Sequence, residues 1–94
     1  MSTIDVRQAH SLGRDEARER LGSLEQMMSK YGVKLEWSGD SAAIKGMAVS
    51  GDIHVHDDDV QVMLKLGMMA KAAGVDADRL KGSIERRLKE AFEG

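Results

Sequence analysis

Apolar residues recur at helical spacing in two stretches of the chain, one near each end. The first stripe consists of Ala17, Leu21, Leu24 and Met28, and Leu12 and Tyr31 extend it at either end. Intervals of three and four residues place such side chains on one face of an amphipathic helix. We expect Ser11 to cap this helix, and we expect Gly32 to end it in the left-handed conformation that glycine adopts freely.

The second stripe lies at the end of the chain. It consists of Leu80, Ile84, Leu88, Ala91 and Phe92. Asp76 stands before this stripe as a candidate N-cap, and Asp78 falls in the first turn, where a carboxylate is favourable. The pattern therefore predicts a second amphipathic helix.

Between the two helices the apolar spacing changes to two, which is typical of strands with one buried face. Four runs show this alternation: residues 33–37, 42–44, 53–55 and 60–66. The stretches "SGDS", "MAVSG" and "DDD" separate the runs and supply turns. Near the start, Ile4 and Val6 alternate with polar neighbours and indicate a short edge strand.

Two of these turns determine how the strands pair. A two-residue turn at 57–58 produces the apolar pairs Val55–Val60 and Ile53–Val62. A turn at 39–40 produces the pairs Trp37–Ala42 and Leu35–Ile44. Both hairpins then carry their apolar residues on one face, and the two helices must cover it. We expect Trp37 to be substantially buried there.

The predicted fold class is therefore α+β. It is an antiparallel meander of four or five strands with two helices packed on one face. The length of 94 residues suits one domain, which we assign to residues 1–94. Small domains gain from self-association, so a homodimer is a candidate state.

Composition narrows the range of partners. The net charge of -2 gives no general attraction to nucleic acid, and the chain has only one Trp, one Tyr and one Phe for stacking on bases. Cysteine is absent, which excludes disulfides and thiolate chemistry. The chain has no signal-peptide pattern and no apolar run near the roughly 20 residues of a membrane span. We expect a cytoplasmic protein that binds neither nucleic acid nor membrane through a span.

The stretch "GDIHVHDDDV" is the first candidate for chemistry. His54 and His56 share a strand face, and the predicted register places Asp59 opposite His56 and Gln61 opposite His54. Imidazoles with a carboxylate suit zinc or another transition metal. A third strong ligand is missing, however, and three lysines (Lys34, Lys45 and Lys65) share the face. We interpret it as a solvated polar face and assign no metal site.

His10 and Ser11 are adjacent, but a nucleophile and its base normally converge from separate parts of a fold. We expect His10 to fix the entry to the first helix instead. We assign no catalytic residues and no cofactor.

The segment "LGMMAKAAGV" carries apolar residues where a polar loop would be usual. Its candidate interaction surface consists of Met68, Met69, Ala72 and Val75. Methionine adapts to apolar partners of irregular shape. The alternative is that these side chains close the end of the core.

Four segments resemble a known family. They are the opening "IDVRQAHSLGRDEAR", the glycine-containing "AVSGDIHV", the strand "DDDVQVMLKLG" and the closing "IERRLKEAF". Together they resemble the small bacterial polyhydroxyalkanoic acid system proteins over nearly the whole chain. The resemblance implies an association with polyhydroxyalkanoate storage, at the granule or in its regulation, and brings no catalytic residues.

Two classes of function follow. The first is a noncatalytic protein associated with polyhydroxyalkanoate granules or granule proteins. The alternative is a small apolar-ligand binding protein or enzyme with a pocket between helices and sheet, lined by Trp37 and Ile44.

Overall fold

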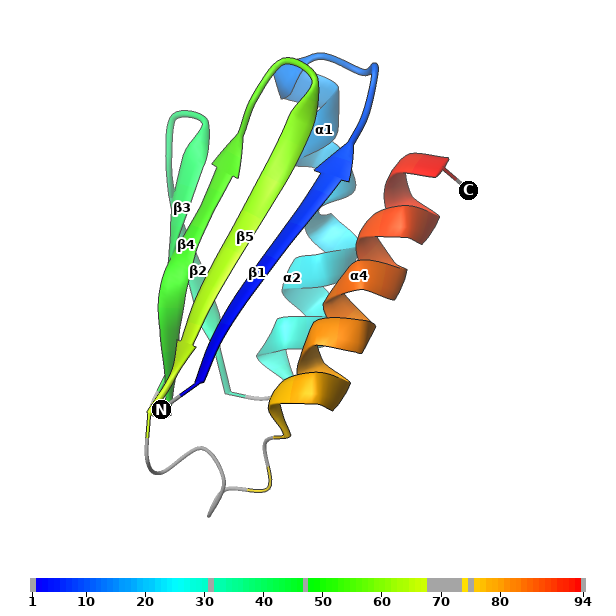
Figure 1. Ribbon diagram of the computed structural model, residues 1–94. Coiled ribbons are helices and arrows are strands. Elements are labelled where there is room, and N and C mark those ends of the chain that lie inside the picture. The colour runs from blue at the N-terminus through cyan, green and yellow to red at the C-terminus, as the bar shows by residue number, and fades with distance from the viewer. Residues whose placement is uncertain (1, 31, 47, 68–73, 75, 94) are drawn as a thin grey trace.

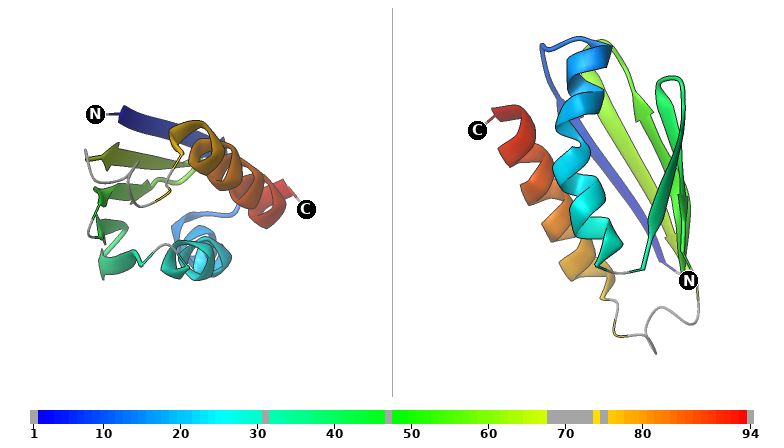
Figure 2. Two further views of the ribbon diagram at one scale, coloured as in Figure 1. Left: turned by 90° about the horizontal axis from the view of Figure 1, so that it is seen from below. Right: turned by 180° about the vertical axis from the view of Figure 1, so that it is seen from behind.

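The computed structural model describes residues 2–30, 32–46, 48–67, 74 and 76–93. Along the chain the elements are β1 (Ser2–Ala9), α1 (Arg14–Arg20), α2 (Gly22–Ser29), β2 (Lys34–Ser38), β3 (Ser41–Lys45), β4 (Val49–Val55), β5 (Asp59–Leu66) and α4 (Ala77–Glu93). The strands form one five-stranded sheet in the order β1-β5-β4-β3-β2, with every neighbouring pair antiparallel. The helices cover one face of it (Figures 1 and 2), which confirms the predicted α+β class.

The hairpin registers are those that the alternation predicts. In the β4–β5 hairpin the paired residues are Val55 with Val60 and Ile53 with Val62. In the β2–β3 hairpin they are Trp37 with Ala42 and Leu35 with Ile44. A shift by one residue would have moved each apolar set to the solvent face, so burial of one face selects this register.

The predicted first strand is confirmed and is longer than its apolar pattern indicates. β1 pairs with β5 along eight residues and forms one edge of the sheet. Its buried side chains, Ile4 and Val6, lie opposite Leu64 and Val62 of β5. β1 therefore adds to the meander of the other four strands as a fifth strand, next to β5.

The turn predicted within residues 47–51 lies earlier than expected. Lys45 of β3 pairs with Ser50 of β4, so Val49 and Gly51 already belong to the strand. Gly51 stands on the inward-facing side of β4, between Ile44 and Leu64 of the neighbouring strands. The glycine suggests a turn in the sequence, but in the structure it allows the backbones of β4 and β5 to approach closely.

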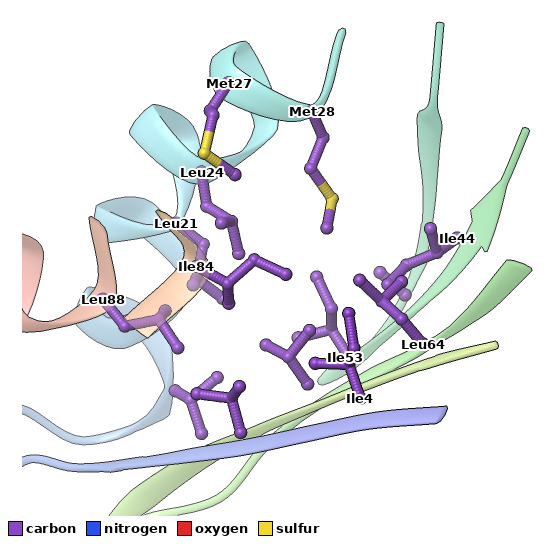
Figure 3. Packing of buried hydrophobic residues seen from close by; sticks show 14 of the residues in the cluster. Ile4, Leu21, Leu24, Met27, Met28, Ile44, Ile53, Leu64, Ile84 and Leu88 are labelled. Carbon is purple, nitrogen blue, oxygen red and sulfur yellow. The ribbon is translucent and has the colours of Figure 1, made fainter. Parts of the chain in front are cut away.

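The core lies between the sheet and the helices (Figure 3). From the helices, Leu21, Leu24 and Met28 of the first pair and Ile84 and Leu88 of α4 project toward the strands. All of them are almost fully buried, as are the sheet residues Ile4, Ile44, Ile53, Val60, Val62 and Leu64. No polar or charged side chain is buried in the part of the chain that the structure describes.

The first helix differs from its prediction at two points. Ser11 is not the cap: Gly13 is the N-cap residue, with φ 79°, and no side chain of the described residues caps the helix. The chain between β1 and α1 is instead tied by His10, as described below. The helix is also interrupted at Leu21, where α1 ends and α2 begins, because Gly22 and Ser23 are weak helix formers.

The remaining helix ends follow the sequence. Gly32 has φ 73°, and the Val33 amide donates to the Met28 carbonyl across this turn. At the start of α4, Asp76 Oδ1 accepts from the amides of Asp78 and Arg79 at 2.9 and 3.2 Å. Both predicted helix signals are therefore confirmed. No helix of the described residues is both long and apolar enough to cross a membrane.

Candidate binding site

A hollow of about 250 Å³ lies between the first helices and β2, one of the two edge strands of the sheet. We call it the Trp37 hollow. Its lining consists of Asp15, Arg18, Glu19, Leu21, Gly22, Glu25 and Trp37. It combines an aromatic ring, a guanidinium and carboxylates, which are groups that recognise ligands through charge and stacking.

Helical spacing explains how the wall forms. Arg18, Gly22 and Glu25 follow at intervals of four and three residues, so they share one side of α1 and α2. This side adjoins the core-facing side that carries Leu24. Gly22 has no side chain and leaves open space in the wall: apart from its chain neighbours and the helix's own backbone, no heavy atom of the described residues lies within 4 Å of where a Cβ would stand. The wall is therefore polar at its ends and open in its middle.

Trp37 forms the opposite wall. Its Nε1–H donates to Glu25 Oε2 at 3.2 Å, and the guanidinium carbon of Arg18 lies 4.7 Å from the ring centroid. The expectation that Trp37 packs on the core side of the sheet is confirmed, because Trp37 is partly buried against the core cluster, and the rest of the side chain stays accessible at the hollow. β2 is the edge of the sheet, so the helices flank this side chain without enclosing it.

Negative charges outnumber positive charges in the lining of the Trp37 hollow. Three carboxylates, those of Asp15, Glu19 and Glu25, stand against the guanidinium of Arg18 in its lining. None of the ion pairs within the described ranges includes Arg18. The local field therefore favours cations, and the cation that the lining itself supplies lies on the indole ring.

A second polar cluster joins the hairpin ends to the start of α1. Arg14 Nη1 lies 2.9 Å from Asp40 Oδ2, and its Nε lies 2.9 Å from Asp57 Oδ1. The hydrogen bond to Asp40 raises the pKa of Arg14, and the charges of Asp57 and Asp40 add to the effect. Arg14 thus remains protonated and links the β2–β3 turn to the β4–β5 turn. We therefore assign Arg14 a structural role in holding these two turns together.

His10 occupies the same end of the sheet. The Leu12 amide donates to His10 Nδ1 at 3.1 Å, so Nε2 carries the hydrogen and donates to the His56 carbonyl at 3.1 Å. The imidazole also stacks on Phe92 of α4 at a centroid distance of 5.3 Å. Both ring nitrogens are therefore used in holding the β1–α1 connection, which is the predicted role of fixing the helix entry.

The histidines of "GDIHVHDDDV" stand as the register predicts. His54 pairs with Gln61, and the His56 amide donates to the Asp59 carbonyl at 2.8 Å. The two rings lie 6.4 Å apart, and His56 Nε2 is 4.0 Å from Asp59 Oδ1, beyond hydrogen-bonding distance. Among the residues that the structure describes, no three His, Asp or Glu side chains form a group that could hold a metal ion.

The predicted interaction surface, Met68, Met69, Ala72 and Val75, lies outside the described residues. It stays a prediction. Of the two residues predicted to line a pocket between helices and sheet, the Trp37 hollow includes Trp37 and not Ile44, and the sequence analysis does not identify its charged residues Arg18, Glu19 and Glu25. The available signal is a tryptophan on the first strand of the predicted meander, which is an edge strand of the sheet.

Comparison with known proteins gives a family and a fold. The family model described as "putative polyhydroxyalkanoic acid system protein" matches residues 4–92. No protein among the curated ones matches the sequence. The NMR structure of PA4090 from Pseudomonas aeruginosa is similar with a TM-score of 0.55 and 11% sequence identity, covering 99% of this chain and 92% of that one. At this identity the likeness concerns the fold alone.

Proposed function

This chain belongs to the polyhydroxyalkanoic acid system protein family, and from this membership we propose that it is a noncatalytic protein that acts in polyhydroxyalkanoate storage by binding. The observation that carries the proposal is the extent of the family match, residues 4–92, which includes every strand and helix core described above. The proposed location is the cytoplasm, at storage granules. The proposed partners are the granule polymer or its associated proteins.

The polar side chains support binding over catalysis. Arg14 and His10, which have the functional groups of catalytic residues, use their hydrogen bonds to hold loops and turns. The charged groups of the Trp37 hollow surround an aromatic ring, an arrangement suited to recognition. A regulatory or adaptor role needs such a surface and no reacting group. The homodimer expected from size stays a prediction.

The alternative function needs an apolar pocket between helices and sheet. The Trp37 hollow has that position, but Ile44, which was expected to line the pocket, is 1% exposed and belongs to the core. The lining is instead rich in carboxylates. The hollow therefore differs in its lining from the Trp37–Ile44 pocket that this alternative expects.

Localisation in living cells tests the proposed function. The chain, fused to a fluorescent protein, would be expressed in bacteria grown with and without polyhydroxyalkanoate accumulation. We expect the signal to collect at granules in accumulating cells and to be diffuse in the others. A signal that stays diffuse in both, at equal expression, would contradict the proposal.

A further inference from the structure

The Trp37 ring already holds a guanidinium on its face. Arg18 Cζ stands 4.7 Å from the ring centroid, which is within the range of a cation–π contact. Arg18 is an exposed side chain of α1, and its long stem can rotate away without disturbing the core. The ring face is therefore a cation-binding surface that an external cation can compete for.

Carboxylates stand around the ring and suit such a cation. Glu25 already accepts from the indole Nε1–H, so its carboxylate is fixed beside the ring at 3.2 Å. Glu19 and Asp15 line the same hollow. When Arg18 leaves, these three carboxylates face a single incoming charge, and charge-assisted hydrogen bonds to them are stronger than neutral ones.

The hollow also lies beside an open sheet edge. β2, five residues long, is an edge strand, and among the described strands only β3 pairs with it. An extended segment can add to such an edge by main-chain hydrogen bonds. Because side chains alternate between faces, the added residue opposite Trp37 would point to the helix-covered face, into the hollow.

We propose that the Trp37 hollow binds a basic extended segment of a partner protein, which lies along β2 and places an arginine side chain on Trp37 in place of Arg18. The charge of the hollow fits this partner and disfavours an acidic one. The proposal goes beyond the function proposed above, since it concerns a site of this chain whether or not the partner sits on a granule.

Trp37 is the only tryptophan in the chain, so its fluorescence reports directly on the site. The probe is a five-residue peptide in which threonine and arginine alternate, matched in length to β2. Its control has citrulline in place of each arginine, which keeps the shape and removes the charge. We expect a saturable change in fluorescence with the arginine peptide that is weaker by about tenfold with citrulline. Equal responses to the two peptides would overturn the proposal.

Charge-neutral variants then locate the binding. Glu25→Gln and Glu19→Gln each keep an oxygen acceptor but lose a charge, and each should weaken peptide binding about fivefold. The matched controls, Glu85→Gln and Glu90→Gln on the exposed side of α4, should leave it unchanged. Equal weakening by both sets would mean general attraction to an acidic protein and would overturn the proposal.

Removing the Arg18 guanidinium, which competes with the peptide for the Trp37 ring, should strengthen peptide binding where the carboxylate variants weaken it. Arg18→Gln should bind the arginine peptide several-fold more tightly, whereas Arg86→Gln, which removes the same charge from α4, should not. Weaker binding by Arg18→Gln, with circular dichroism unchanged, would show that Arg18 supports the partner and would overturn the proposal that an arginine displaces it.

Backbone N-methylation at alternate peptide residues should abolish binding if the segment pairs with β2. Retained binding would overturn the proposed pairing with β2.

Discussion

The guanidinium carbon of Arg18 lies 4.7 Å from the centroid of the Trp37 ring. This contact joins α1 to β2, an edge strand of the sheet. The chain has a single tryptophan, and it stands at the boundary of the core with one polar neighbour on its face and another at its Nε1. Trp37 is therefore positioned to contribute to both folding and recognition.

Partial burial sets the expected cost of removing this side chain. Trp37→Ala should lower the free energy of unfolding by about 1 to 2 kcal/mol, below the roughly 3 to 5 kcal/mol of a fully buried aromatic. Ile53→Ala, at a position that is 0% exposed, should cost more, about 2 to 5 kcal/mol. Urea unfolding followed by circular dichroism compares the two without relying on tryptophan fluorescence. A Trp37→Ala cost equal to or above that of Ile53→Ala would place the ring in the core.

Strand pairing could be predicted because it depends on local alternation. Val55 and Val60 are separated by four residues, and only a short turn brings both to the same face. The Asp76 cap is equally local, since its acceptor serves amides two and three residues away. The strand register and the helix cap could therefore be predicted, because each depends on residues close together in the sequence.

Features that join distant segments could not be predicted in the same way. Ser11 does not cap the first helix. The connection before this helix is held instead by the His10 ring, which bonds to the His56 carbonyl 46 residues later. The Trp37 hollow depends on β2 being the sheet edge, which follows from β1 joining β5 at the other side. Neither relationship leaves a periodic trace in the sequence.

Gly51 lies where the sheet leaves no room for a side chain. A Cβ there would overlap the Met63 carbonyl oxygen and stand 2.9 Å from Leu64 Cα, so the backbone of β5 would have to move. Gly51→Ala should therefore destabilise the fold by about 3 kcal/mol, at the upper end for overpacking. The measurement is the midpoint of urea unfolding.

Gly82 supplies the matched control. It lies inside α4, and apart from its chain neighbours and the helix's own backbone, no heavy atom of the described residues comes within 4 Å of the place that an added methyl group would take. Gly82→Ala should therefore stabilise the chain by about 0.5 to 1 kcal/mol. If Gly51→Ala were as well tolerated as Gly82→Ala, β4 and β5 would be farther apart than the structure has them.

The start of α4 depends on one carboxylate. Asp76→Ala removes the acceptor for the Asp78 and Arg79 amides and should cost about 1 kcal/mol in thermal unfolding. Asp76→Asn keeps an oxygen at the same place and should retain most of the stability. An Asn variant as unstable as the Ala variant would mean that charge, and not capping geometry, is responsible.

The segment after β5 stays the predicted contact with granules. Replacing both Met68 and Met69 with Gln should weaken partition onto granules, because each methionine can bury about 1.5 to 3 kcal/mol of apolar side chain against a polymer. Met63→Gln is the control: Met63 is 36% exposed on β5, on the sheet face that carries Lys34, Glu36, Lys45, Asp52, His54 and Lys65. Desolvation of those charges disfavours contact there. A folded double variant, checked by circular dichroism, that partitions like wild type would remove these methionines from the contact.

Sedimentation of the purified protein with native polyhydroxyalkanoate granules tests the central claim most directly. Intact granules and granules stripped of their proteins would be compared at equal polymer surface, with an unrelated acidic protein of similar size as the reference. We expect this chain to sediment with intact granules well above the reference, and a loss on stripping would identify a granule protein as its partner. Sedimentation no greater than the reference on both kinds of granule would contradict the account of this chain as a granule-binding member of its family.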